Sequence, residues 1–225
     1  MKTIAVYNNK GGAGKTTIAA HLCLLAEEWQ VPTIGAGLDR QGDLLKWMSQ
    51  GDAVAKEDAF FERSEFLSIV YSPMVMPELR GVDLVVIDCP VEIEIALTIN
   101  PSMWLIPVHG RLGFENMHNV LPDILATKAT VLVIKNNGGR GGVMVDRNLD
   151  AALKAVKGLT VYADTLPESD TICRSADFAD AAWNLPYANR KMVTTKGASA
   201  IKNMCTHVLT QCGFRKPPAV PQKRK

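Results

Sequence analysis

The chain has 225 residues, 47% of them apolar, and a formal net charge of +2, which predicts one domain with a single buried core. No apolar run approaches the roughly 18 residues that cross a bilayer, and the N-terminus has no signal-peptide pattern, so we expect a cytoplasmic protein. The five cysteines show neither a CxxC pair nor the histidine spacing of a metal site, so they are interpreted as reduced, mostly buried thiols.

Short apolar runs separated by helical periodicity predict alternating strands and helices. The runs are continuously apolar, which is typical of strands covered on both faces. Strands are expected at 3–7, 32–37, 66–71, 82–88, 104–108, 130–135 and 159–163, and helices at 18–29, 114–126, 146–157 and 197–212. This order predicts an α/β fold, a doubly wound and mostly parallel sheet flanked by helices, with ligands bound at the carboxyl ends of the strands.

A glycine-rich stretch, KGGAGKTT at 10–17, follows the first predicted strand and precedes the first predicted helix. Glycines let backbone N–H groups converge on an anion, and the start of a helix adds partial positive charge. In such a loop Lys15 reaches the β- and γ-phosphates, and the Thr16 hydroxyl can ligate Mg²⁺. The residues assigned to phosphate binding are Gly11, Gly12, Ala13, Gly14, Lys15, Thr16 and Thr17.

A second lysine distinguishes this loop from the ordinary P-loop. The usual pattern has glycine at position 9, whereas here Asn9 is followed by Lys10. The arrangement K-G-G-x-G-K-T-T resembles the deviant Walker A box of the ParA/MinD superfamily of P-loop ATPases. The resemblance implies that ATP is the cofactor and that Lys10 crosses a homodimer interface to the partner's nucleotide, while Lys15 contacts the nucleotide of its own subunit. The alternative is that Lys10 is a solvated loop charge.

Two carboxylates match further motifs of the family. The stretch GAGLDRQGD resembles its switch I motif, D-x-D-P-Q-G, and implies that Asp39 positions the attacking water. Gly37 and Arg40 depart from the first aspartate and the proline of that motif, and Asp39 could instead be an ordinary turn residue. The apolar strand that ends in Asp88 has the Walker B pattern, in which the carboxylate holds the Mg²⁺ shell, here through water.

The adenine side of the site is matched more loosely. Asn136 and the loop 166–170 correspond to family elements that select adenine through amide and backbone contacts. The resemblance runs from about residue 2 to 212, so residues 1–212 are assigned to the ATPase domain. The prolines and charges of 213–225 predict a basic, disordered tail.

The C-terminal region is strongly basic. Residues 190–225 contain nine Lys or Arg and no Asp or Glu, so the rest of the chain carries −7. We interpret this region as a surface for non-specific double-stranded DNA, because lysine and arginine neutralise phosphates without reading bases. The alternative is a solubilising tail. The basic residues are Arg190, Lys191, Lys196, Lys202, Arg215, Lys216, Lys223, Arg224 and Lys225.

The branch of the family decides the expected function. Asn8 and Asn9 favour ParA-type partition proteins, and the proline-rich end cannot form a membrane-docking amphipathic helix. The resemblance implies a nucleoid-associated, ATP-dependent homodimer that positions a plasmid, a chromosome or a large protein complex. Its slow hydrolysis would be stimulated by a cargo-bound protein. A metabolic P-loop ligase or kinase, and a weakly hydrolysing DNA-bound scaffold, remain alternatives.

Overall fold

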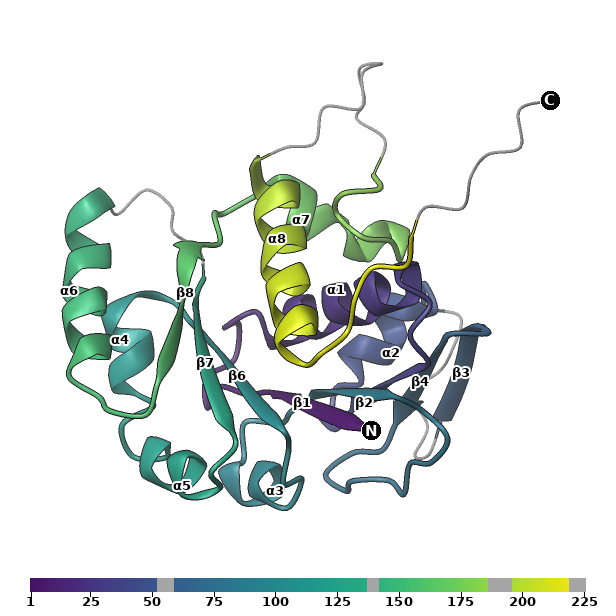
Figure 1. The fold of residues 1–225 in the computed structure, drawn as a ribbon, viewed down its shortest axis with the longest axis horizontal. Coiled ribbons are helices and arrows are strands. Elements are labelled where there is room, and N and C mark those ends of the chain that lie inside the picture. Colours follow the sequence, from purple (N-terminus) through teal and green to yellow (C-terminus); the bar gives the residue numbers. More distant parts are fainter. Residues whose placement is uncertain (52–58, 137–141, 186–195, 219–225) are drawn as a thin grey trace.

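The fold is a sheet of eight strands with helices on both faces (Figure 1), seen in a computed structural model that describes residues 1–51, 59–136, 142–185 and 196–218. The strand order is β3-β4-β2-β5-β1-β6-β7-β8. All neighbouring strands are parallel except β3 and β4, which confirms the doubly wound, mostly parallel sheet. The strands are β1 (Lys2–Val6), β2 (Thr33–Gly37), β3 (Ala59–Ser64), β4 (Leu67–Tyr71), β5 (Leu84–Asp88), β6 (Met103–Val108), β7 (Thr130–Lys135) and β8 (Thr160–Thr165).

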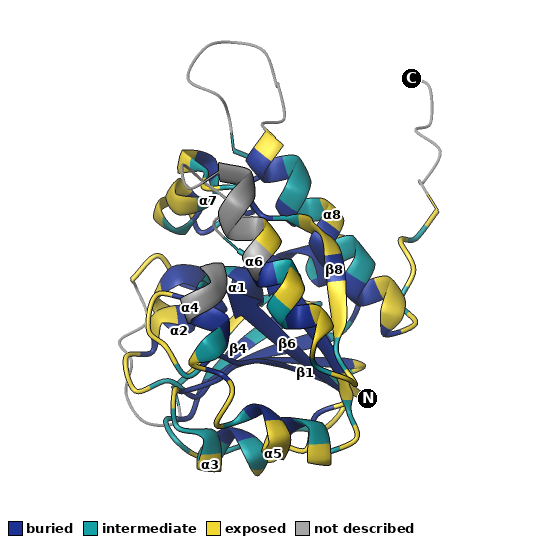
Figure 2. Ribbon diagram, turned by 90° about the vertical axis from the view of Figure 1, so that its left-hand side faces the viewer, coloured by how far each residue is buried: buried dark blue, intermediate teal, exposed yellow. Residues whose placement is uncertain are grey.

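The helices cover both faces of the sheet, and its central strands are buried between them (Figure 2). In β1, Ile4 and Val6 join the core beneath α1, α2 and α8, whereas Ala5 and the following Tyr7, just after the strand, join the core beneath the helices of the other face. This alternation explains why the strand sequences are continuously apolar. The helices are α1 (Lys15–Glu28), α2 (Asp43–Met48), α3 (Ile93–Leu97), α4 (Gly110–Glu115), α5 (Leu121–Ala126), α6 (Gly142–Lys154), α7 (Asp170–Arg174) and α8 (Lys196–Gln211).

Two predicted helices need correction, and one strand was not predicted. The single helix expected over 114–126 is wrong, because α4 ends at Glu115 and α5 begins at Leu121 with Pro122 in its first turn, the one helical place that a residue without an N–H tolerates. The helix expected over 146–157 begins at 142 and ends at 154. Strand β3 was not predicted. Its outer edge is unpaired by any described strand and its sequence mixes aromatic with charged residues.

Helix α8 packs against α1 with the apolar face that its spacing predicts. Ile201, Met204, Cys205 and Val208 are at most 1% exposed, which confirms that this face belongs to the core. All five cysteines are free, and all except Cys173 are buried. Across the four described ranges, no helix combines the length and the apolar character needed to cross a membrane.

Candidate functional site

The glycine loop is anchored at its start by two asparagines. The buried side chain of Asn8 donates from Nδ2 to the Pro107 carbonyl (2.8 Å) and accepts the Lys10 N–H at Oδ1 (2.9 Å). Asn9 donates from Nδ2 to the carbonyl of Asn116, 2.6 Å away. The loop is therefore tied to the end of β6 and to the turn after α4 before it reaches its glycines.

The end of the loop requires glycine. Gly12 and Gly14 have φ angles of +71° and +93°, which residues with a side chain rarely adopt. A Cβ on Gly14 would lie 2.4 Å from Nδ2 of Asn136, and the same nitrogen donates to the Ala13 carbonyl at 2.8 Å. Asn136, predicted to lie on the adenine side, therefore packs directly against the loop.

The loop and the start of α1 line an open cavity of about 370 Å³. Lys15 is 8% exposed and its Nζ donates to the Lys10 carbonyl at 3.3 Å, so its ammonium lies within the loop. Glycine N–H groups, the start of a helix and a buried ammonium are the features that bind phosphate. The cavity is lined by Gly11, Gly12, Ala13, Gly14, Lys15, Thr16, Thr17, Asp39, Gln41, Asp43 and Val91.

Thr16, which lines this cavity, contacts Asp88 at the tip of β5. The Thr16 hydroxyl donates to Oδ2 of Asp88 at 2.7 Å, and Asp88 is 1% exposed at the tip of β5. Burial raises the pKa of Asp88 from 3.8 to about 7, against the Thr16 hydrogen bond and the charge of Lys15. Its other oxygen, Oδ1, is buried without a hydrogen-bond partner among the described residues. A hydroxyl beside a carboxylate with a free oxygen fits a hydrated Mg²⁺ ion.

Asp39 reaches the same cavity from the loop between β2 and α2. Its Oδ1 accepts the Gln41 N–H at 2.9 Å, so Asp39 also makes the turn contact considered as the alternative to catalysis. Gly37 pairs with Asp88 across β2 and β5. An aspartate at position 37 would have stood beside Asp88, so this chain offers one carboxylate there instead of two.

A second cavity, of about 170 Å³, lies on the other side of the glycine loop. Asn136 and residues 166–169, the segments expected on the adenine side, line it together, and Ile201 of α8 adds an apolar wall. Gly12, Gly14 and Thr17 line both cavities. A molecule with an apolar base and a chain of phosphates can therefore span the two.

The basic C-terminal region is described only in part. Lys202 contacts both carboxylate oxygens of Glu28 at 3.0 Å and lies 5.0 Å from the ring centre of Trp183, so its charge is already paired. The exposed basic residues described are Lys196, Arg215 and Lys216. Arg190, Lys191, Lys223, Arg224 and Lys225 lie outside the described residues.

Sequence reasoning missed the residues that support the site from a distance. The hydroxyl of Tyr71 donates to the Arg40 carbonyl at 2.8 Å. His21 of α1 contacts the Thr17 carbonyl and lies 5.6 Å, ring centre to ring centre, from both Trp47 and Trp183. These contacts join segments far apart in the chain, so no local pattern indicates them.

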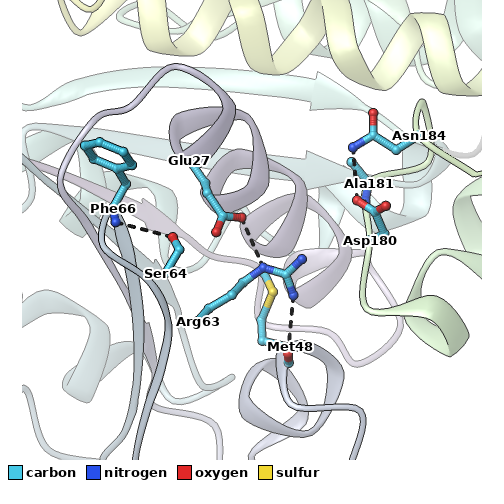
Figure 3. Close-up of polar contacts among 8 residues, drawn as sticks. All are labelled: Glu27, Met48, Arg63, Ser64, Phe66, Asp180, Ala181 and Asn184. Atoms are coloured by element: carbon cyan, nitrogen blue, oxygen red, sulfur yellow. Dashed lines mark hydrogen bonds and ion pairs between the residues drawn. The ribbon is translucent and has the colours of Figure 1, made fainter.

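Helix α2, which follows the Asp39 loop, is held at its other end by β3 (Figure 3). Arg63 donates to the Glu27 carboxylate at 3.0 Å and to the Met48 carbonyl at 3.4 Å. A guanidinium at the C-terminal end of a helix satisfies a terminal carbonyl and interacts favourably with the helix dipole. The unpredicted edge strand therefore fixes the helix behind the Asp39 loop.

The first strand of a mostly parallel sheet leads through a glycine loop into a helix, and a buried carboxylate lies at the tip of β5, the neighbouring strand in the sheet. This arrangement defines a P-loop nucleotide-binding protein. Residues 4–181 match the family described as the CobQ/CobB/MinD/ParA nucleotide binding domain. The chain belongs to this family, which confirms the resemblance to ParA/MinD proteins.

Individual relatives cover different shares of the chain. Maintenance of carboxysome distribution protein A from Halothiobacillus neapolitanus is 34% identical over 111 residues, 47% of this chain and 50% of that protein, so the match spans half of its length. An ATP complex of a McdA variant from Cyanothece superposes with a TM-score of 0.75 at 17% identity, covering 97% of this chain and 99% of the other. MinD from Pyrococcus horikoshii with Mg-ADP gives 0.68 at 17% identity, covering 97% and 99%. At these identities the two structures show the fold alone.

Proposed function

We propose that the protein is a slow ATPase that dimerises with ATP and positions a cargo on DNA. One observation carries the proposal: Lys15, Thr16 and Asp39 line one cavity, and Thr16 donates to Asp88, whose other oxygen has no hydrogen-bond partner among the described residues. The name of the relative that shares 34% identity over half its length supports cargo positioning.

The proposed chemistry divides among four residues. Lys15 neutralises the β- and γ-phosphates, and Thr16 and Asp88 would hold Mg²⁺, which supplies positive charge to the phosphates when it is bound. Asp39 orients the attacking water for in-line attack. Because Gly37 places no second carboxylate beside Asp88, we expect slow hydrolysis that a cargo-bound protein stimulates.

The dimer rests on Lys10. Its main chain is fixed on both sides, since its N–H binds Asn8 and its carbonyl accepts from Lys15, yet the residue is exposed. Within the described ranges its ammonium has no acidic partner. A fixed backbone that presents an unpaired cation at the edge of a phosphate cavity suits contact with the nucleotide of a second copy.

DNA binding would use the basic C-terminal region of both subunits. Lys202 is paired with Glu28, whereas Lys196, Arg215 and Lys216 are exposed. Two weak basic surfaces joined in one dimer bind more tightly than either alone, so nucleotide-driven dimerisation can switch DNA binding. This cycle would place the protein on the nucleoid of the cytoplasm.

Binding to random-sequence double-stranded DNA, measured with ATP and with ADP across a salt series, tests this function. We expect tight binding with ATP alone, with log K falling by about 0.9 per phosphate contact for each unit of log salt. Lys216→Gln should weaken binding and reduce the slope, whereas Lys202→Gln, which removes a charge already paired with Glu28, should change them less. Equal binding with both nucleotides, or none, would contradict the proposal.

A further inference from the structure

The loop that carries Asp39 is held in place from the end of β4. The Tyr71 hydroxyl donates to the carbonyl of Arg40 at 2.8 Å, and the N–H of Met74 donates to the carbonyl of Leu38 at 3.0 Å. Asp39 lies between these two carbonyls. The first carbonyl belongs to the peptide after Arg40 and the second to the peptide before Asp39, so the same neighbouring segment restrains the main chain on both sides of Asp39.

The Tyr71 ring lies against Gly37. These two residues pair across β2 and β4, and Tyr71 is 5% exposed. A Cβ on Gly37 would lie 3.9 Å from Cδ2 of Tyr71 and 3.6 Å from Cβ of Leu44, both ordinary contact distances. A methyl group would fit there, but a longer side chain would compete with the ring or with Leu44.

The hydrogen bond of Tyr71 bears on one departure from the D-x-D-P-Q-G pattern, Arg40 in place of proline. Proline at position 40 would stiffen the loop through its fixed φ, and here the Tyr71 hydroxyl restrains Arg40 instead. A side chain on the adjacent strand therefore supplies the restraint that a proline would give at position 40.

We propose that Tyr71 is a positioning residue that holds Asp39 at the phosphate cavity through the main chain of Arg40. The inference rests on the proposed ATPase function for the role of Asp39, whereas the restraint on the loop does not depend on it. The hydrogen bond that the hydroxyl makes within the described part of the chain is to main chain, so its loss should disturb the orientation of Asp39 and leave the phosphate-binding loop intact.

Tyr71→Phe tests this role because it keeps the ring and removes the hydroxyl. We expect kcat for ATP hydrolysis to fall by about two- to tenfold, with KM and ATP affinity unchanged. Tyr162→Phe, on β8, is the matched control and should leave hydrolysis as in the wild type. Asp39→Ala establishes whether hydrolysis depends on Asp39 at all.

Limited digestion with trypsin tests the restraint without any ATPase activity. Arg40 is exposed, and Tyr71 holds the carbonyl of the peptide bond that trypsin would cut. Tyr71→Phe should speed cleavage after Arg40 relative to cleavage after the exposed Arg80 of the same chain. The Tyr162→Phe control should leave this ratio unchanged.

The outcomes distinguish the proposed ATPase function from the positioning role of Tyr71. If the wild type hydrolyses no ATP, or Asp39→Ala is fully active, the proposed function fails, and the cleavage ratio still decides whether Tyr71 restrains the loop. Unchanged kcat in Tyr71→Phe with an active wild type overturns the positioning role, as does an unchanged cleavage ratio. A joint fall of kcat, ATP affinity and melting temperature also overturns it, because that pattern indicates a general structural role.

Discussion

Lowering the pH should destabilise the protein through His21. The ring is fully buried, with Nδ1 2.7 Å from the Thr17 carbonyl and Nε2 3.2 Å from the Ala182 nitrogen. Because the Ala182 N–H can only donate, Nε2 must accept and Nδ1 must carry the proton. A second proton would break the contact with Ala182 and place a charge between Trp47 and Trp183.

The size of the effect follows from the pKa of His21. Burial lowers this pKa from 6.5 to about 4, against the Thr17 carbonyl and the charge of Asp180. The imidazole of His21 therefore binds a second proton near pH 6.5 in the unfolded chain, but only near pH 4 in the folded chain. The stability contribution is complete above pH 6.5 and is lost as the pH falls to about 4, which corresponds to about 3 kcal/mol.

Urea unfolding followed by tryptophan fluorescence, between pH 7 and pH 4, measures this loss. His21→Gln can keep both hydrogen bonds but does not titrate, so its stability relative to the wild type should improve by about 3 kcal/mol as the pH falls. His118→Gln, which removes an exposed imidazole, should show no such gain. If the free energies of unfolding of the wild type and His21→Gln differ by a constant amount across this pH range, the reasoning is refuted.

Three further substitutions test the glycine loop. Lys15→Ala should abolish ATP binding in isothermal titration calorimetry, because it removes the buried ammonium; retained affinity would exclude its phosphate role. Lys10→Ala should bind ATP normally yet remain monomeric in light scattering with ATP, and a normal ATP dimer would remove Lys10 from the interface. Gly14→Ala should lower stability by about 1 to 3 kcal/mol, because its φ is +93° and its Cβ would meet Asn136. Gly11→Ala, whose Cβ would meet nothing within 4 Å, is the control in thermal unfolding, and equal melting temperatures would contradict the argument.

Most of the sheet could be predicted because buried parallel strands have a strong local pattern. All seven predicted strands exist, with ends within two residues of those expected. Strand β3 was missed because the residues that define it, such as Arg63 with its contacts to α1 and α2, act on distant segments. The division between α4 and α5 was missed although Pro122 was a visible signal against a continuous helix.

The site was predictable where the residues that act together are close in sequence. The glycine loop has this property. Asp39 and Asp88 were added through the resemblance to two further family motifs, the first just after an expected strand and the second as the last residue of another. Tyr71 and His21 could not be identified, because each acts through a contact between its side chain and the main-chain carbonyl of another residue. A hydrogen bond to a carbonyl places no requirement on the partner's residue type, so it leaves no paired pattern in the sequence.

The two walls of the smaller cavity are synthesised far apart in time. Gly12 and Gly14 precede Ile201, on α8, by about 190 residues in the chain. At about 5 to 20 residues per second, translation separates them by roughly 10 to 40 s. Strand β1 can pair in the sheet only after β5 and β6, its neighbours on either side, have been synthesised. A nascent chain therefore carries the glycine loop long before it can enclose a nucleoside, so a ligand of both cavities can stabilise the nearly complete fold but cannot guide its first steps.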